Sequence, residues 1–89
     1  MSDLYNGLRQ RLEQEGGWPK IYLFKFIIPN NNHTLAQTEA LFGPESQVSL
    51  TQSKTGKYIS VTAKELMISA DEVIRRYEKS SEIAGLMAL

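Results

Sequence analysis

Hydrophobic residues recur with two different spacings along the chain, and each spacing predicts a different kind of element. Near the N-terminus, Leu4, Leu8 and Leu12 are four residues apart, which is typical of an amphipathic helix. Gly16 and Gly17 would end this helix, because glycine readily adopts the backbone conformation found just past a helix C-terminus. The apolar stripe is narrow, so we expect the helix to pack against the rest of the domain or against a partner.

After Trp18 and Pro19, the pattern changes to one that repeats every two residues, as in a strand. Residues 20–29, KIYLFKFIIP, are rich in β-branched and aromatic residues and are apolar on both faces apart from Lys25. Such a run predicts a central strand. Alternation predicts a core face made of Tyr22, Phe24, Phe26 and Ile28, and an opposite face made of Ile21, Leu23, Lys25 and Ile27.

A short helix is predicted after this strand. The asparagines at positions 30–32 can bond the free N–H groups of its first turn. The helix covers residues 34–43, and Gly43 and Pro44 end it. Its inward residues are Leu35, Thr38, Leu41 and Phe42.

Two strands follow this helix. Residues 47–53 predict a polar edge strand with Val48 and Leu50 turned inward, and residues 57–67 predict a second central strand. In the second of these strands, one face holds Ile59, Val61 and Ala63, and the other holds Tyr58, Ser60, Thr62 and Lys64.

The C-terminal part predicts a capped helix and a last strand. The sequence SADE is a capping box, in which Ser69 caps the helix and Glu72 reaches back. Gly85 breaks the helix, and residues 86–89 form a short terminal strand. The buried stripe of the helix is Val73, Ile74 and Tyr77, with Ile83 near its end.

The predicted order is a helix followed by β-α-β-β-α-β, which is the order of the ferredoxin-like sandwich. This α+β fold has a four-stranded antiparallel sheet with two helices on one face. We therefore predict an N-terminal helical extension over residues 1–17 and a single ferredoxin-like domain over residues 18–89.

Composition and charge narrow the functions to be considered. Ten Lys and Arg balance ten Asp and Glu over 89 residues, whereas nucleic-acid binders usually carry a basic surplus. The chain has no cysteine, which fits a reducing compartment. We expect a cytoplasmic protein without a membrane segment, because neither a signal peptide nor an apolar run of about 20 residues is present.

Residues that commonly carry catalysis are scarce. The only histidine, His33, lies in the asparagine-rich loop, and without cysteines a structural zinc site is not expected. Asp3 and Asp71 both fall in helix first turns, where negative charge is stabilising. On the C-terminal helix, we expect Glu72 to pair with Arg75 or Arg76. We predict neither enzyme activity nor a cofactor.

The most distinctive stretch is SKTGKYISVTA, residues 53–63. A nucleotide-binding P-loop needs a second glycine upstream of the Gly-Lys pair and a helix after it, but here no such glycine precedes Gly56, and a strand follows. We predict a β-hairpin instead, with Lys54 to Lys57 as the turn and Gly56 at positive φ.

The polar face of this strand should lie beside Lys25 if the two central strands pair. Ammonium and hydroxyl groups would then lie on the sheet face that the two helices leave open. RNA-recognition domains stack bases on such a face, but Tyr58 is the single aromatic residue where their pattern has several. The candidate ligand- or partner-binding residues are Lys25, Ser53, Lys54, Gly56, Lys57, Tyr58, Ser60 and Lys64.

About 70 residues of the chain resemble the bacterial YbeD-like family of domains of unknown function. The resemblance lies in WPKIYLFKFII and in the segment from Ser53 to Leu89, and the hairpin is its most specific part. The matching positions are Pro19, Lys25, Ser53, Lys54, Gly56, Lys57, Tyr58, Ser60, Val61, Ile74, Tyr77, Gly85 and Leu89.

This resemblance implies a ferredoxin-like fold similar to small-molecule regulatory domains of the ACT type, and it implies no enzyme activity. The chain departs from the family in its longer N-terminal helix and in Thr55, which adds to the hairpin turn. We therefore expect a non-catalytic regulatory or interaction module that binds a protein partner or a small anionic ligand. The partner could also be a second copy of the chain, bound through residues 86–89 or the N-terminal leucine stripe. Weak binding of single-stranded RNA by the open face is the alternative function.

Overall fold

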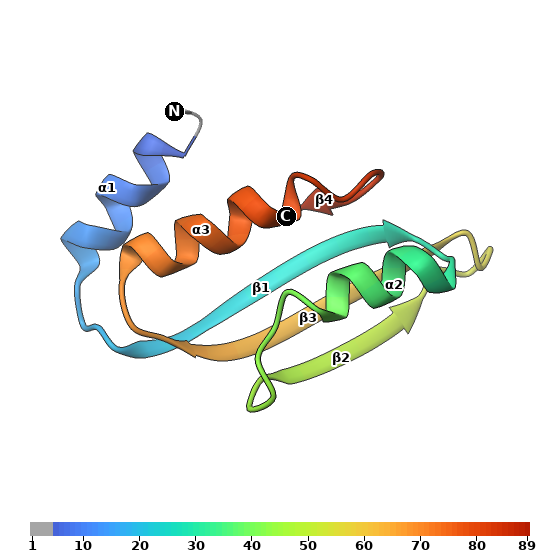
Figure 1. Cartoon of the computed structure of the whole chain (residues 1–89), viewed down its shortest axis with the longest axis horizontal. Helices are drawn as coiled ribbons and strands as arrows, with labels where there is room; N and C mark the ends of the chain where they lie inside the picture. The colour runs from blue at the N-terminus through green and yellow to red at the C-terminus, as the bar shows by residue number, and fades with distance from the viewer. Residues whose placement is uncertain (1–4) are drawn as a thin grey trace.

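The computed structural model describes residues 5–89 and contains three helices and four strands (Figure 1). Leu4 and Asp3, which entered the predictions for the first helix, lie outside the described residues. The elements are α1 (Asn6–Glu15), β1 (Lys20–Pro29), α2 (Asn32–Glu39), β2 (Gln47–Gln52), β3 (Tyr58–Met67), α3 (Ala70–Ser80) and β4 (Met87–Ala88).

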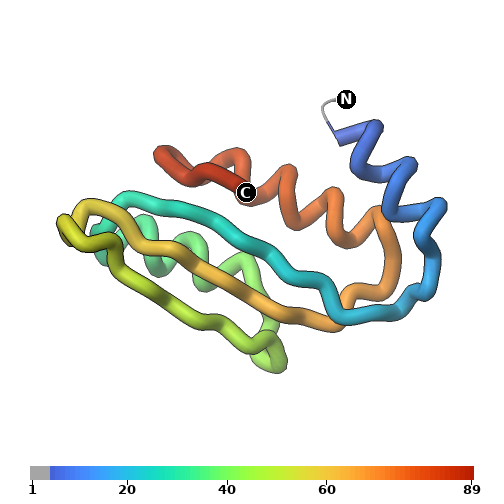
Figure 2. Tube along the Cα trace, turned by 180° about the vertical axis from the view of Figure 1, so that it is seen from behind, coloured from blue at the N-terminus to red at the C-terminus, as the bar shows by residue number. Residues whose placement is uncertain are grey.

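The four strands form one antiparallel sheet in the order β2-β3-β1-β4. The long central pair runs in register from Lys20 opposite Met67 to Pro29 opposite Tyr58. Seen from behind, strands β1, β3 and β2 pass in front of α2 (Figure 2). The predicted α+β class and antiparallel four-stranded sheet are confirmed.

The core lies on the helix side of the sheet, as the alternation along the two central strands predicts. Phe24, Phe26 and Ile28 of β1 are fully buried or nearly so, and Val61 of β3 has no exposed surface. Each such side chain contributes roughly 1.5–3 kcal/mol by leaving water. From α3 the core receives Val73, Ile74 and Tyr77, the stripe expected from the sequence.

Aromatic rings fill the centre of this core. The ring centroids of Phe24 and Tyr77 are 5.4 Å apart in an edge-to-face arrangement, and Phe42 lies 5.8 Å from Phe24. The Tyr22 and Tyr77 hydroxyls share a hydrogen bond of 3.1 Å. Burial and this bond raise the pKa of Tyr77 far above its usual range.

Helix α1 packs mainly against α3 and not over the exposed face of the sheet. Leu12 is buried in the core, and Leu8 packs partly against it. The Tyr5 hydroxyl donates a 3.4 Å hydrogen bond to the Tyr77 carbonyl, and the Trp18 indole donates one of 3.3 Å to the Leu12 carbonyl. Leu8 and Leu12, the leucines of the stripe that lie within the described residues, thus pack within this chain.

Two predicted helix caps are present. Asn31 accepts a 2.7 Å bond from the Thr34 N–H at the start of α2, and Ser69 accepts one of 3.2 Å from the Glu72 N–H at the start of α3. Each cap satisfies a backbone donor that has no partner within its helix.

Both of these helices end earlier than the sequence predicts. Helix α2 stops at Glu39, so Leu41 and Phe42 lie in a following turn, although Phe42 still reaches the core. Helix α3 stops at Ser80, and Gly85 lies beyond it at a φ of 84°. Tight turns after each helix, and not the glycines, end the helical hydrogen bonding.

Val48 and Leu50 of β2 turn toward the helix side of the sheet, as predicted, but they are not buried. They pair with Ala63 and Val61 and so lie on the helix side, but 37% and 45% of their surface is exposed. The main contact of helix α2 with the sheet is to β1, so the edge strand β2 is only partly covered.

Candidate interaction surface

The face of the sheet opposite the helices carries large apolar side chains that no element within residues 5–89 covers. Ile21, Leu23 and Leu66 are 63%, 47% and 57% exposed. We call this surface the open face. Strand pairing places on it Ile21, Leu23, Lys25 and Ile27 of β1, Tyr58, Ser60, Thr62, Lys64 and Leu66 of β3, Gln47, Ser49 and Thr51 of β2, and Met87 of β4.

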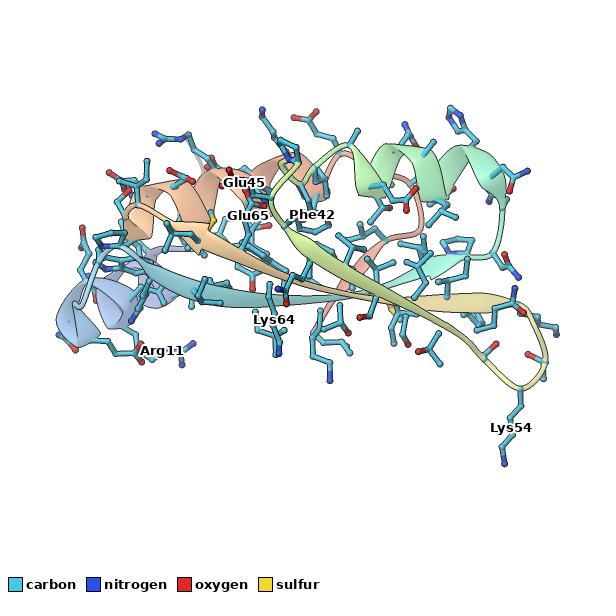
Figure 3. The ribbon with its side chains drawn as sticks, turned by 90° about the horizontal axis from the view of Figure 1, so that it is seen from below. Arg11, Phe42, Glu45, Lys54, Lys64 and Glu65 are labelled. Carbon is cyan, nitrogen blue, oxygen red and sulfur yellow. The ribbon has the colours of Figure 1, made fainter. Side chains whose placement is uncertain are left out.

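Two lysines lie side by side in the middle of the open face. Lys25 is opposite Thr62 and Lys64 is opposite Leu23, so the two lysines are diagonal neighbours on adjacent strands. Such neighbours are separated by roughly 7–8 Å. In Figure 3, Lys64 points away from the helices, whereas Glu65, the next residue, points toward them. No residue assigned to the open face is acidic.

The hairpin after β2 has the predicted form. Gly56 has a φ of 74°, and its N–H donates a 3.0 Å hydrogen bond to the Ser53 carbonyl. The Ser53 hydroxyl accepts a 3.2 Å bond from the Tyr58 N–H, and the Asn30 side chain donates one of 2.7 Å to the Gly56 carbonyl. These bonds give Ser53 and Gly56 a structural role in the turn.

The candidate residues therefore divide into two groups. Lys25, Ser60 and Lys64 lie together on the open face. Lys57 precedes β3 and is seven residues from Lys64, which corresponds to roughly 24 Å along a strand. Lys54 projects from the tip of the hairpin, away from the body of the molecule (Figure 3). Lys57 is therefore too far from Lys64 for the two to contact one small group together.

Two hollows adjoin the open face. The smaller, about 280 Å³, lies toward the hairpin and is lined by Ile27, Ser53, Tyr58, Ser60 and Met87. The larger, about 700 Å³, lies at the other end and continues around the edge of β3 beyond the start of β2. It is lined by Ile21, Gly43, Pro44, Glu45, Gln47, Lys64, Glu65, Leu66, Ile68 and Glu72.

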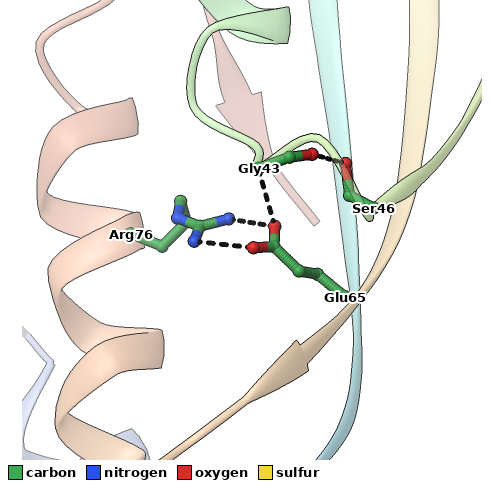
Figure 4. A network of polar contacts seen from close by, with 4 residues as sticks. All are labelled: Gly43, Ser46, Glu65 and Arg76. Carbon is green, nitrogen blue, oxygen red and sulfur yellow. Dashed lines mark hydrogen bonds and ion pairs between the residues drawn. The ribbon is translucent and has the colours of Figure 1, made fainter.

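An ion pair on the opposite side of the sheet joins α3 to β3 (Figure 4). The Arg76 guanidinium donates hydrogen bonds of 2.7 Å and 3.4 Å to the Glu65 carboxylate, which also accepts a 3.3 Å bond from the Gly43 N–H. The bonds from Arg76 hold the pKa of Glu65 below its usual range, against the opposing effect of burial. Arg76 also lies 5.5 Å from the centres of the Phe24 and Phe42 rings.

This pair corrects the predicted pairing of Glu72 with Arg76, because Arg76 reaches the strand instead. A signal in the sequence was missed: Glu65 has the inward phase of Ile59, Val61 and Ala63. A carboxylate on a core face requires a buried partner. The bond from the Gly43 N–H to Glu65 holds the loop after α2 against β3. Within that loop, the Ser46 hydroxyl donates a 2.7 Å bond to the Gly43 carbonyl.

The remaining predicted polar residues lie apart from the open face. His33 is exposed on α2, and Asp71 forms an ion pair with Arg9 of α1. Within residues 5–89, no three His, Cys, Asp or Glu side chains gather closely enough to hold a metal ion. Among the helices of the described part, none has the length and apolar character needed to cross a bilayer.

Comparison with protein-family models, with curated proteins and with solved structures finds no match to this chain. Its function is therefore inferred from its own residues. The feature that most calls for an explanation is the open face, where exposed apolar side chains lie beside two adjacent lysines.

Proposed function

We propose that this chain is a non-catalytic protein-interaction module whose open face binds a partner protein. The observation that carries the proposal is the exposure of Ile21, Leu23 and Leu66 together on one face. Exposed apolar patches of this kind mark interaction sites in soluble proteins. Helix α1 packs against α3 and does not cover this face.

We further propose a ferredoxin-like arrangement and membership of the YbeD-like family. The strand order supports the fold, because β1 and β3 are central and β2 and β4 lie at the edges. The two helices that follow β1 and β3 lie on the same side of the sheet (Figure 3). In this reading, residues 1–17 are an extension added to a domain of residues 18–89, and the module is regulatory and cytoplasmic.

Single-stranded RNA is a weaker candidate for the same face. Base-stacking domains place several aromatic residues on their exposed strands. Here Phe24 and Phe26 are buried on the helix side, and Tyr58 is the aromatic residue of the open face. The position of these rings favours a protein partner over RNA.

Site-specific photocross-linking in cells of the source organism tests the proposed function. A photoreactive phenylalanine analogue at Leu23 or Leu66 should give a discrete cross-linked band with one partner. The matched control carries the analogue at Gln37, which is exposed on α2 on the opposite side. Equal labelling from all three positions, or none from the open face, would contradict the proposal.

A further inference from the structure

We propose that the segment bound by the open face is an acidic amphipathic one, with carboxylates over Lys25 and Lys64 and apolar side chains on either side of them. This inference rests on the proposed function of the open face and adds the chemistry of the partner. Three features of the face support it: the position of the two lysines, the absence of acids from the face, and the division of its apolar residues into two groups.

The first feature is that the strands place no acidic side chain beside the two lysines on the open face, although Glu45, Glu65 and Glu72 line the larger hollow together with Lys64. Strands β1, β2, β3 and β4 contain a single acidic residue, Glu65. It points to the helix side, where Arg76 already binds it. A partner that covers Lys25 and Lys64 removes water from two ammonium groups, which is costly unless it supplies an anion.

The same feature argues against a second copy of this chain as the occupant. Two open faces packed together would bring two Lys25 and two Lys64 ammonium groups into one interface without a carboxylate. Such an interface would combine desolvation with like-charge repulsion. Charge complementarity therefore selects a different, acidic partner.

The apolar residues then define where the carboxylates lie along the partner. Ile21, Leu23 and Leu66 form one group beside the larger hollow, and Ile27 and Met87 form the other beside the smaller hollow. From Ile21 to Ile27 the strand advances roughly 20 Å. Lys25 lies between the two groups, and Lys64 lies opposite Leu23, at the inner edge of the first group. A helix of about 14 residues has this length, so its apolar side chains belong at both ends and its acids in the middle.

Binding of synthetic peptides to the full chain tests this proposal. We would use three fluorescein-labelled helical peptides of about 18 residues, with the same leucines at both ends and with glutamate, glutamine or lysine in the middle turn. Fluorescence anisotropy should rank them glutamate, glutamine, lysine, with a gap of about tenfold between the first two at low salt. Raising NaCl to about 0.5 M should remove most of that gap.

Variants of the chain test whether Lys25 and Lys64 cause the preference for the glutamate peptide over the glutamine peptide. The double variant Lys25→Gln with Lys64→Gln should bind the glutamate and glutamine peptides equally, whereas Lys54→Gln should retain the full preference. Leu23→Ser should weaken all three peptides alike. Equal binding of all peptides by the unmodified chain, a preference for lysine, or no binding of any peptide would overturn the acidic partner. The proposed function would then still be judged separately, by cross-linking at Leu23.

Discussion

The two faces of the β1–β3 pair are built from the same backbone but have opposite environments. On the helix side, Phe24, Phe26 and Val61 lose essentially all contact with water. On the open side, Leu23, which precedes Phe24, and Leu66 of β3 are about half exposed although they are equally apolar. Apolar character alone thus does not decide burial. A face becomes core only where another element of the chain lies over it.

The largest difference between the faces should appear when neighbouring residues of β1 are truncated. Phe24→Ala should lower the free energy of unfolding by about 3–5 kcal/mol, because it leaves a cavity among packed rings. Leu23→Ala should cost less than about 1 kcal/mol, since roughly half of the side chain is already in water. Urea denaturation of the two variants measures both values, and similar losses would contradict the division into core and open faces.

A somewhat smaller difference in the free energy of unfolding is expected when Glu65 and Lys64, neighbouring charged residues on opposite faces of β3, are each replaced. Glu65→Gln should cost about 2–3 kcal/mol, because it leaves the largely buried Arg76 without its counter-charge. Lys64→Gln, one residue away on the open face, is the matched control. Chemical denaturation at neutral pH should separate the two variants clearly. A Glu65→Gln variant as stable as the unmodified chain would mean that the ion pair is not a structural element.

The pH dependence of stability should trace to the same carboxylate. The folded pKa of Glu65 is lowered, so the unfolded chain binds more protons and stability rises with pH in this range. The contribution should be fully present above the unfolded pKa of about 4.3 and should be lost as the pH falls through the lower folded value. Unfolding experiments at several acidic pH values check this. The slope should be shallower in Glu65→Gln, and an unchanged slope would assign the effect to other groups.

The smallest effect is expected for the lysines of the open face. Lys25→Gln and Lys64→Gln should each change the free energy of unfolding by no more than about 0.5 kcal/mol. Removing one of two neighbouring like charges should make the change neutral or slightly stabilising. Thermal or chemical denaturation measures it, and a large loss of stability would show that these residues are structural.

Much of the sheet could be predicted from the sequence because successive side chains of a strand point to opposite faces of the sheet. Residues 20–29 are confirmed as a strand with the expected core face, and the caps at Asn31 and Ser69 follow from short-range hydrogen-bonding chemistry. To predict that Lys25 and Lys64 lie on one face, only one further assumption was needed, namely that the two central strands pair, and they do.

The features that the sequence did not reveal depend on contacts between distant elements. The exposure of Val48 and Leu50 follows from the position of α2 over β1, which no local pattern encodes. Arg76 has suitable helical spacing to Glu72 but binds Glu65 across the helix–sheet interface.

Covering of the open face in the cell can be measured directly, because the chain contains no cysteine. Single variants Leu23→Cys and Leu66→Cys would be alkylated in the purified protein and in intact cells, with Lys54→Cys at the hairpin tip as the control. If a partner occupies about nine in ten copies, the two open-face cysteines should react about tenfold more slowly in cells relative to the control. Equal relative rates in both settings would contradict the claim that the open face is an interaction surface.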